Sequence, residues 1–408
     1  MQSSLLILFH KGGFAKKVSI KQKKIIATAL ISMFAMITIL ILLVTPFQGI
    51  KATDTNADIE FAVIYSNAMD EGFEIIRYDT RGNILNEKKF KEGQAIYHFS
   101  EFENNYYLMS ERKNRHYILS QDGEVNLLFG PEKYEKDRNI GSAFSRSSEK
   151  HMFFSMNVGI NPEYSPDEYL SELVYFDGSK NSNIELLGYI QSVVEENNKA
   201  YALFFNGNNN KLGIYVIDLL DNKLIKTIPI DNHLNQFEGY FPAGQNNGSS
   251  LQIYQDKLIL ILDGNTKETQ YKPIMQIINP SSGELEQEIS ISQQNFDVFD
   301  TQIFNNKLYV ISTNSSFIEF NGSEFKRKMI KLNQDEQFIK QRKSDRGNIS
   351  GIKIIGNQIY ILYDFVKGIP SERTREIREY NLETGEEGII IPLSYRSDKE
   401  IIKFFNVY

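Results

Sequence analysis

Beyond residue 57 the chain alternates between short polar turns and apolar strands. A turn of three polar residues runs directly into each apolar strand, as at Asn305–Lys307 before LYVIS. The other instances are 103–105 before YYLMS, 148–150 before HMFFS, 197–199 before AYALFF, 255–257 before LILIL and 356–358 before IYILY, with 57–58 before IEFAVIY as the seventh. Asn, Asp and Gly at such positions supply the backbone conformations that tight hairpins need. The spacing predicts a structural repeat of roughly fifty residues.

A second hairpin follows each of these turns. It consists of a strand, a tight turn and another strand, as in 73–90, 116–129, 274–291, 317–332 and 377–393. One more short strand, such as 95–99 or 351–355, stands before each polar turn, so each repeat contains four strands. A single four-stranded sheet cannot bury both of its faces alone. We therefore expect the sheets to stack around an axis.

The repeat resembles the blades of the β-propeller superfamily, over roughly 350 residues. The resemblance implies an all-β propeller, and we count seven four-stranded blades. Six or eight stay open because the long stretch 205–257 could hold an irregular unit. The last segment, 400–408, is typical of an innermost strand, whereas the first repeat begins at its second strand near Ile59. We expect the C-terminal strand to complete the first blade. The alternative is a β-sandwich, for which seven units of four strands are too many.

No motif of an individual propeller family is present. The chain has no Trp-Asp signature, no kelch Gly-Gly pair, no sialidase Asp-box and no tryptophan docking signature of quinoprotein dehydrogenases, and it contains no Trp at all. The resemblance therefore implies a fold and assigns no function.

An uncharged apolar segment precedes the repeats. Residues 25–44, IIATALISMFAMITILILLV, are long enough as a helix to cross the hydrocarbon core of a bilayer. All charged residues of 1–24 are Lys, so the positive-inside rule predicts a cytoplasmic basic tail, a single-pass transmembrane helix at 25–44, a stalk at 45–58 and an extracellular propeller at 59–408. A cleaved signal peptide is the alternative, although the apolar run is long for one.

Composition narrows the partners. The chain has no Cys, which excludes disulfides and thiolate metal sites. Residues 1–44 hold six of the 45 basic side chains and none of the 52 acidic ones, so the remainder is more acidic than the net charge of −7 indicates. An acidic body repels phosphate backbones, and we expect no nucleic-acid partner. The five His residues lack metal-ligand spacing, and we predict no metal, no cofactor and no catalytic residue.

The loops predict a working face. The long connections 130–139, 156–171, 231–248, 263–272, 333–348 and 364–374 should all lie on one face, opposite the short turns and the stalk. Aromatic side chains there can stack on sugars or anchor a peptide, and arginines can clamp an anion. Our candidate ligand-binding residues are Tyr164, Tyr169, Phe237, Tyr240, Phe241, Arg342, Arg346 and Arg373. The competing interpretation is that these aromatics pack the loops onto the blades.

Three functions fit this organisation. The first is a membrane-anchored binding or scaffold propeller on the bacterial cell surface, which captures a protein, peptide or glycan on its long-loop face. The second is an enzyme of lyase or hydrolase type with its site in the central channel, where ionisable side chains would converge. The third is an envelope sensor that signals through the helix. The sequence favours the first and leaves the ligand and the oligomeric state open.

Overall fold

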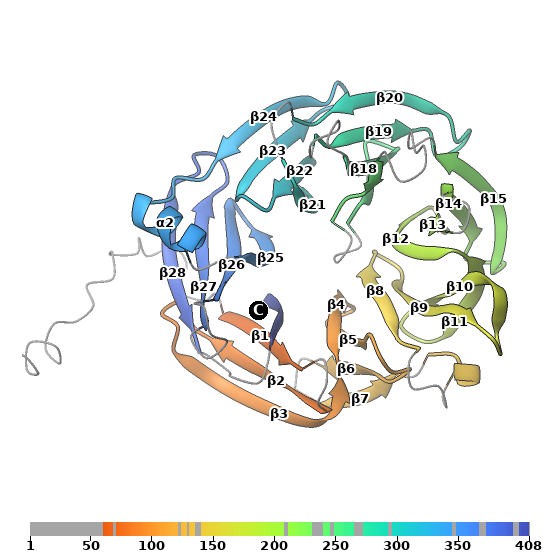
Figure 1. Cartoon of the computed structure of the whole chain (residues 1–408), viewed down its shortest axis with the longest axis horizontal. Coiled ribbons are helices and arrows are strands. Elements are labelled where there is room, and N and C mark those ends of the chain that lie inside the picture. The colour runs from red at the N-terminus through yellow and green to blue at the C-terminus, as the bar shows by residue number, and fades with distance from the viewer. Residues whose placement is uncertain are drawn as a thin grey trace, which may run out of the picture. The chain divides into compact units, whose positions relative to one another are not determined.

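Seven β-sheets arranged around a central channel make up the body of the protein (Figure 1). The computed structural model describes residues 60–67, 71–120, 124–128, 130–134, 140–207, 211–230, 240–244, 249–264, 272–292, 296–344, 348–366, 373–394 and 400–407. The predicted transmembrane segment 25–44 lies outside these residues. Among those described, no helix is both long and apolar enough to cross a bilayer.

Each sheet is one blade, and its strands are named in order from the innermost to the outermost. Blades 1 to 3 are β29 (Glu400–Val407), β1 (Glu60–Ser66), β2 (Glu71–Tyr78), β3 (Ile84–Gln94); β4 (Ile96–Phe102), β5 (Asn105–Ser110), β6 (His116–Ser120), β7 (Val125–Leu128); and β8 (Ser142–Ser147), β9 (Met152–Asn161), β10 (Ser165–Phe176), β11 (Asn181–Leu187). Blades 4 and 5 are β12 (Tyr189–Glu196), β13 (Lys199–Asn206), β14 (Lys211–Asp218), β15 (Lys223–Ile230); and β16 (Tyr240–Pro242) with β17 (Leu251–Tyr254), then β18 (Lys257–Gly264), β19 (Ile274–Ile278), β20 (Leu285–Ser290). Blades 6 and 7 are β21 (Val298–Phe304), β22 (Lys307–Ser312), β23 (Ser316–Asn321), β24 (Lys326–Lys331); and β25 (Asn348–Ile355), β26 (Gln358–Val366), β27 (Arg373–Asn381), β28 (Glu387–Leu393). The short helices are η1 (Glu132–Tyr134) and α2 (Glu336–Ser344).

The ring closes as predicted. Strand β29 pairs antiparallel with β1, in a register that sets Glu60 opposite Val407 and Ser66 opposite Glu400. The two ends of the propeller sequence thus share blade 1, and both the seven-blade count and the interlocked blade are confirmed. Long-range pairing of this kind leaves no open end to the stack of sheets.

The hydrophobic core lies between the blades. Seven buried clusters each join one blade to the next. Strand β1 shows the reason: Phe61, Val63 and Tyr65 pack toward blade 7, whereas Ala62 and Ile64 pack toward blade 2. Successive side chains of a strand point to opposite faces, so an unbroken apolar strand can serve both neighbours.

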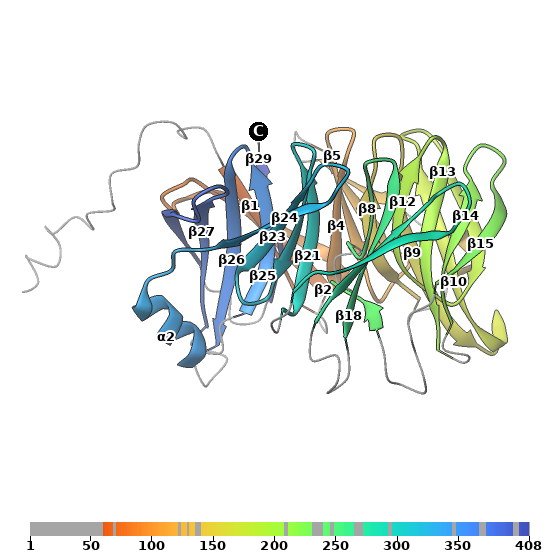
Figure 2. The same ribbon diagram turned by 90° about the horizontal axis from the view of Figure 1, so that it is seen from above.

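The polar turns predicted from the sequence connect the first and second strands of the blades. Asn305 and Asn306 both have positive φ, as do Asn197 and Asn198. Two successive residues of this conformation match the twist of a two-residue hairpin, which Asn, Asp and Gly adopt most readily. These short turns gather on one face together with the end of β29, while α2 lies at the opposite face (Figure 2).

Two predicted long connections contain regular secondary structure. Most of 156–171 extends strands β9 and β10 into a long hairpin. The connection 333–348 contains helix α2, whose N-terminus is capped by the Asp335 carboxylate accepting the Phe338 amide at 2.6 Å. The sequence left the stretch 205–257 open, and its described residues form no extra blade; they include the divided inner strand of blade 5, β16 and β17.

Candidate functional site

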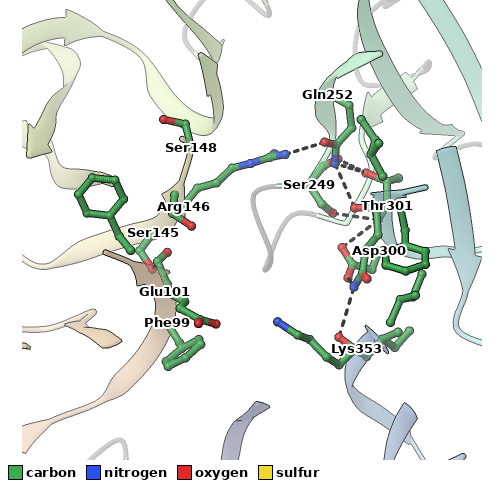
Figure 3. Close-up of a pocket in the computed structure, with 18 of the residues that line it drawn as sticks. Phe99, Glu101, Ser145, Arg146, Ser148, Ser249, Gln252, Asp300, Thr301 and Lys353 are labelled. Atoms are coloured by element: carbon green, nitrogen blue, oxygen red, sulfur yellow. Dashed lines mark hydrogen bonds between the residues drawn. The ribbon is translucent and has the colours of Figure 1, made fainter. Parts of the chain in front are cut away.

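A cavity of about 780 Å³ lies in the central channel. Inner strands of blades 2, 3, 5, 6 and 7 contribute its lining, and its rim includes the short turns at Glu103, Asn104, Ser148 and Glu149. The cavity therefore belongs to the short-turn face. Figure 3 shows its side chains entering from opposite walls.

A β-bulge shapes the inner strand above the cavity. In β4, β8, β12, β21, β25 and β29 the pairing with the second strand slips by one residue, for example at Phe299 between Val298 and Asp300. In blade 5 the same place holds a longer insertion, since Ala243 and Ser250 both bond to Ile261. A bulge bends its strand and redirects side chains. In β4, β8, β21 and β25 the strand segments that follow the slip line the cavity.

One position of the inner strand recurs around the channel. It is the residue paired with the second strand's Tyr107, Phe153, Tyr201, Ile259, Tyr309 or Tyr360. The residues at this position are Ser100, Arg146, Val194, Gln252, Gln302 and Lys353. Five of these six are polar. Ser100, Gln252 and Gln302 hydrogen-bond to the next blade along the chain, whereas Arg146 reaches the blade after the next one.

Arg146 spans blade 4 to reach blade 5. Its guanidinium donates to the Leu251 carbonyl at 2.9 Å and to Gln252 Oε1 at 2.6 Å, with Ser192 Oγ at 3.5 Å. Blade 4 carries apolar Val194 at the recurring position, so the long arginine crosses it. Burial lowers the pKa of Arg146 to about 10, and the nearby Asp300 carboxylate partly opposes that effect. The guanidinium remains charged at neutral pH and links blade 3 to blade 5 through its hydrogen bonds.

The network continues through blades 5, 6 and 7. Gln252 Nε2 donates to the Thr301 carbonyl at 3.0 Å and to Thr301 Oγ1 at 2.8 Å. Asp300 accepts from the Thr301 amide at 2.8 Å and from Gln302 Nε2 at 2.9 Å. The same Gln302 amide group donates to the Ile352 carbonyl at 3.2 Å. Asp300, buried at 8% exposure, is therefore held in place.

Two further charges face the cavity without such support. Glu101 of β4 in blade 2 and Lys353 of β25 in blade 7 are half-buried, and their charged ends are turned toward one another (Figure 3). Among the described residues, neither side chain makes a hydrogen bond or an ion pair. Partly buried charges of this kind are normally paired.

The tyrosines predicted as ligand contacts lie on the β9–β10 hairpin of blade 3. The Tyr164 hydroxyl donates to the Lys133 carbonyl at 2.9 Å, and its ring meets Tyr134 edge-on at 5.0 Å. The Tyr169 hydroxyl bonds Asn157, and its ring lies edge-on to Tyr189. Burial raises the pKa of Tyr169 to about 12. Both rings pack against their own and neighbouring blades.

Three other candidates lie elsewhere on the ring. Tyr240 and Phe241 form β16, where Tyr240 packs against the core between blades 4 and 5 and Phe241 meets Phe205 at 5.8 Å. Arg342 of α2 donates to Ser315 Oγ at 2.7 Å and lies 5.0 Å from the Tyr363 ring. These contacts hold the segments onto the blades.

The structure does not bring the predicted residues together at one site. Phe237 and Arg346 lie outside the described residues, and Arg373 begins β27 with its side chain outside the description. None of the five described candidates lines the channel cavity. Their role in binding stays a prediction.

A sequence signal for the channel residues exists. Arg146, Gln302 and Lys353 each stand seven residues before the second-strand aromatic residue with which they pair. Which of these positions face a cavity depends on the bulges, which the alternation of residue types does not reveal. Within the described part of the chain no three His, Asp or Glu side chains are grouped as a metal site requires.

Comparison with known proteins supports the fold. No protein family matches the chain, and no curated protein does. The periplasmic gluconolactonase PpgL of Pseudomonas aeruginosa has a similar structure, with 10% identity, 85% of this chain and 99% of that chain covered and a TM-score of 0.52. AztD of Citrobacter koseri gives 10% identity, coverage of 85% and 98% and a TM-score of 0.47. At such identities the likeness shows the fold alone, and the chain is a seven-bladed β-propeller.

Proposed function

We propose that this protein is a binding propeller whose ligand enters the central channel from the short-turn face. One observation carries the proposal: a cavity of about 780 Å³ into which Glu101 and Lys353 project from two different blades with their charged ends turned toward one another (Figure 3). Ligand sites are concave and combine apolar surface with a few convergent polar groups. Phe99, Ile303 and Ile352 contribute apolar surface to the lining of this cavity.

The proposal extends to where the propeller works. The lysine-flanked apolar segment 25–44 supports single-pass anchoring, with the propeller outside the cell. The predicted stalk leads into Glu60, which lies opposite Val407 on the short-turn face. Alkaline extraction of membranes, combined with protease added to intact cells, tests this part. Release of the full chain at alkaline pH would remove the anchor from the proposal.

Hydrogen–deuterium exchange tests the channel site. The full chain in detergent micelles would be screened by thermal shift against amino acids, sugar acids, dicarboxylates and neutral hexoses. A compound that raises the melting temperature should then slow exchange in β4, β21 and β25 while leaving the outer strands β15 and β24 unchanged. Protection confined to the long connections would instead place binding on the opposite face and refute the channel site.

An enzyme with its site in the same cavity is the second candidate. The observation in its favour is that ionisable side chains from several blades, including Glu101, Asp300 and Lys353, converge there. The two candidates differ in what happens to the ligand. Mass spectrometry after prolonged incubation should return it unchanged from a binding protein, whereas a new product that disappears in the Lys353→Met variant would establish an enzyme.

A further inference from the structure

We propose that the channel ligand is zwitterionic, with an ammonium group held by Glu101, a carboxylate held by Lys353 and an aliphatic segment between them. This inference rests on the proposed function, because it names the ligand class of the same cavity. Its basis is the distribution of engaged and unengaged charges around the channel.

Arg146 and Asp300 already make hydrogen bonds within the protein. The two best-placed donors of Arg146 are bonded to blade 5, and both Asp300 oxygens accept hydrogen bonds from their own strand. Using either group for a ligand would break contacts between or within blades. Arg146 and Asp300 therefore have a structural role in the cavity wall, and we do not expect them to bind the ligand.

Glu101 and Lys353, in contrast, have no partner among the residues that the structure describes. They come from blades 2 and 7, on either side of the closing blade 1, and their charged ends are turned toward one another in the channel (Figure 3). They are too far apart to form an ion pair. An object that fits between a carboxylate and an amine must present a positive group to the first and a negative group to the second. A ligand of one sign would satisfy one side chain and be repelled by the other.

The apolar part of the wall fits the middle of such a ligand. Ile303, next to the recurring polar position on β21, is 39% exposed although it belongs to an inner strand that lines the cavity. Exposed apolar surface within a cavity favours methylene groups of a ligand. The chemistry points to an amino acid in which a hydrocarbon chain separates the two charges, or to a short peptide with its termini in the same roles.

A series of ω-amino acids of increasing length tests the inference. Glycine, β-alanine, 4-aminobutyrate and 6-aminohexanoate carry the same two charges at increasing separation, whereas hexylamine and hexanoate each carry one. Isothermal titration on the full chain should show binding that peaks at one length in the series and is at least tenfold weaker for both single-charge compounds. Triglycine against 6-aminohexanoate distinguishes a peptide from a simple amino acid of similar span.

Variants assign the two ends. Glu101→Gln and Lys353→Met should each weaken the best amino acid at least tenfold, while Lys328→Met on the exposed outer strand β24 serves as the matched control. The double exchange Glu101→Lys with Lys353→Glu should recover affinity, because the ligand can bind in the reversed direction. Unchanged melting temperatures of the variants would confirm that folding is intact.

The outcomes separate the two proposals. If neutral hexoses or single-charge compounds bind in the channel as well as the amino acids do, the zwitterion is wrong and the channel site stands. The same conclusion follows if none of the amino acids binds but another compound protects β4 and β25 from exchange. If an amino acid binds and neither variant changes its affinity, both the ligand class and the channel site fail.

Discussion

Replacing Arg146 by Met tests whether the channel network stabilises the ring. The substitution keeps much of the side-chain length and removes the guanidinium. The Leu251 carbonyl and Gln252 Oε1 then lose their donor from blade 3. We expect the free energy of unfolding to fall by about 1–3 kcal/mol.

The magnitude follows from two opposing effects. Hydrogen bonds to a charged partner contribute about 1.5–3 kcal/mol each, so the two short bonds contribute about 3–6 kcal/mol. Burial opposes them, since it lowers the pKa of Arg146 from 12.5 to about 10. A fall of that size corresponds to roughly 3 kcal/mol of lost charge stabilisation. The difference is about 0–3 kcal/mol in favour of the native contacts, and the expected fall of about 1–3 kcal/mol is its upper part, because the substitution also leaves the Leu251 carbonyl and Gln252 Oε1 without this donor.

Urea unfolding followed by tyrosine fluorescence measures the effect. The matched control is Arg115→Met, an exposed arginine of blade 2, which should change stability by less than about 0.5 kcal/mol. Adding Gln252→Ala to each background gives a double-mutant cycle, in which we expect a coupling of about 1 kcal/mol between the two side chains. If Arg146→Met lowers the free energy of unfolding no more than the control does, and the cycle shows no coupling, then these hydrogen bonds do not stabilise the contact between blades 3 and 5.

Three further substitutions test titratable side chains that are wholly or partly buried. Burial and the neighbouring Asp297 raise the pKa of Asp263 to about 7, so the folded state loses stability as pH rises from about 4 to 7. Urea unfolding should therefore show that Asp263→Asn adds about 1–3 kcal/mol to the free energy of unfolding at pH 8 and nothing at pH 4. Burial lowers the pKa of His116 to about 3, so the folded state loses stability as pH falls below about 6.5. His116→Gln should reduce the difference in the free energy of unfolding between pH 7 and pH 5 by about 1–2 kcal/mol. An unchanged difference would contradict this prediction. Lys133, whose side chain is 36% exposed, lies 2.8 Å from the fully buried Glu172, so Lys133→Met should cost about 1–3 kcal/mol in thermal and urea unfolding. Adding Glu172→Gln should restore at least half of that loss, and a double variant as unstable as the single would argue against the pairing.

Repetition made the fold predictable from sequence. Turns such as Asn305–Lys307 mark the first hairpin of each blade, and apolar alternation in strands such as β1 predicts faces that must both be covered. The closing strand 400–408 could be placed because β1 lacks a preceding inner strand in the sequence. Signals of this type depend only on neighbouring residues, so they can be recognised without knowing how the blades meet.

The candidate site could not be predicted in the same way. The aromatics Tyr164 and Phe241 stand in long connections, but their contacts with Tyr134 and Phe205 depend on how blades meet. The channel residues come from strands about fifty residues apart, and one-residue bulges decide their direction. A slip of one residue turns a strand's side chains to the other face, and residue types alone do not show where it occurs.

The polarity of the channel needs an explanation beyond stability. Seven apolar clusters already join the blades, and Val194 shows that an inner strand can carry an apolar side chain at the recurring position. Arg146, Gln252 and Gln302 contribute to holding the ring through hydrogen bonds. Glu101 and Lys353 make no such contribution among the described residues, yet their partial burial carries a desolvation cost. A binding role therefore predicts that Glu101→Gln and Lys353→Met raise the melting temperature or leave it unchanged while ligand affinity falls. If the two side chains served only to stabilise the ring, both substitutions would instead lower the melting temperature, so the direction of that change separates a binding site from a structural lining.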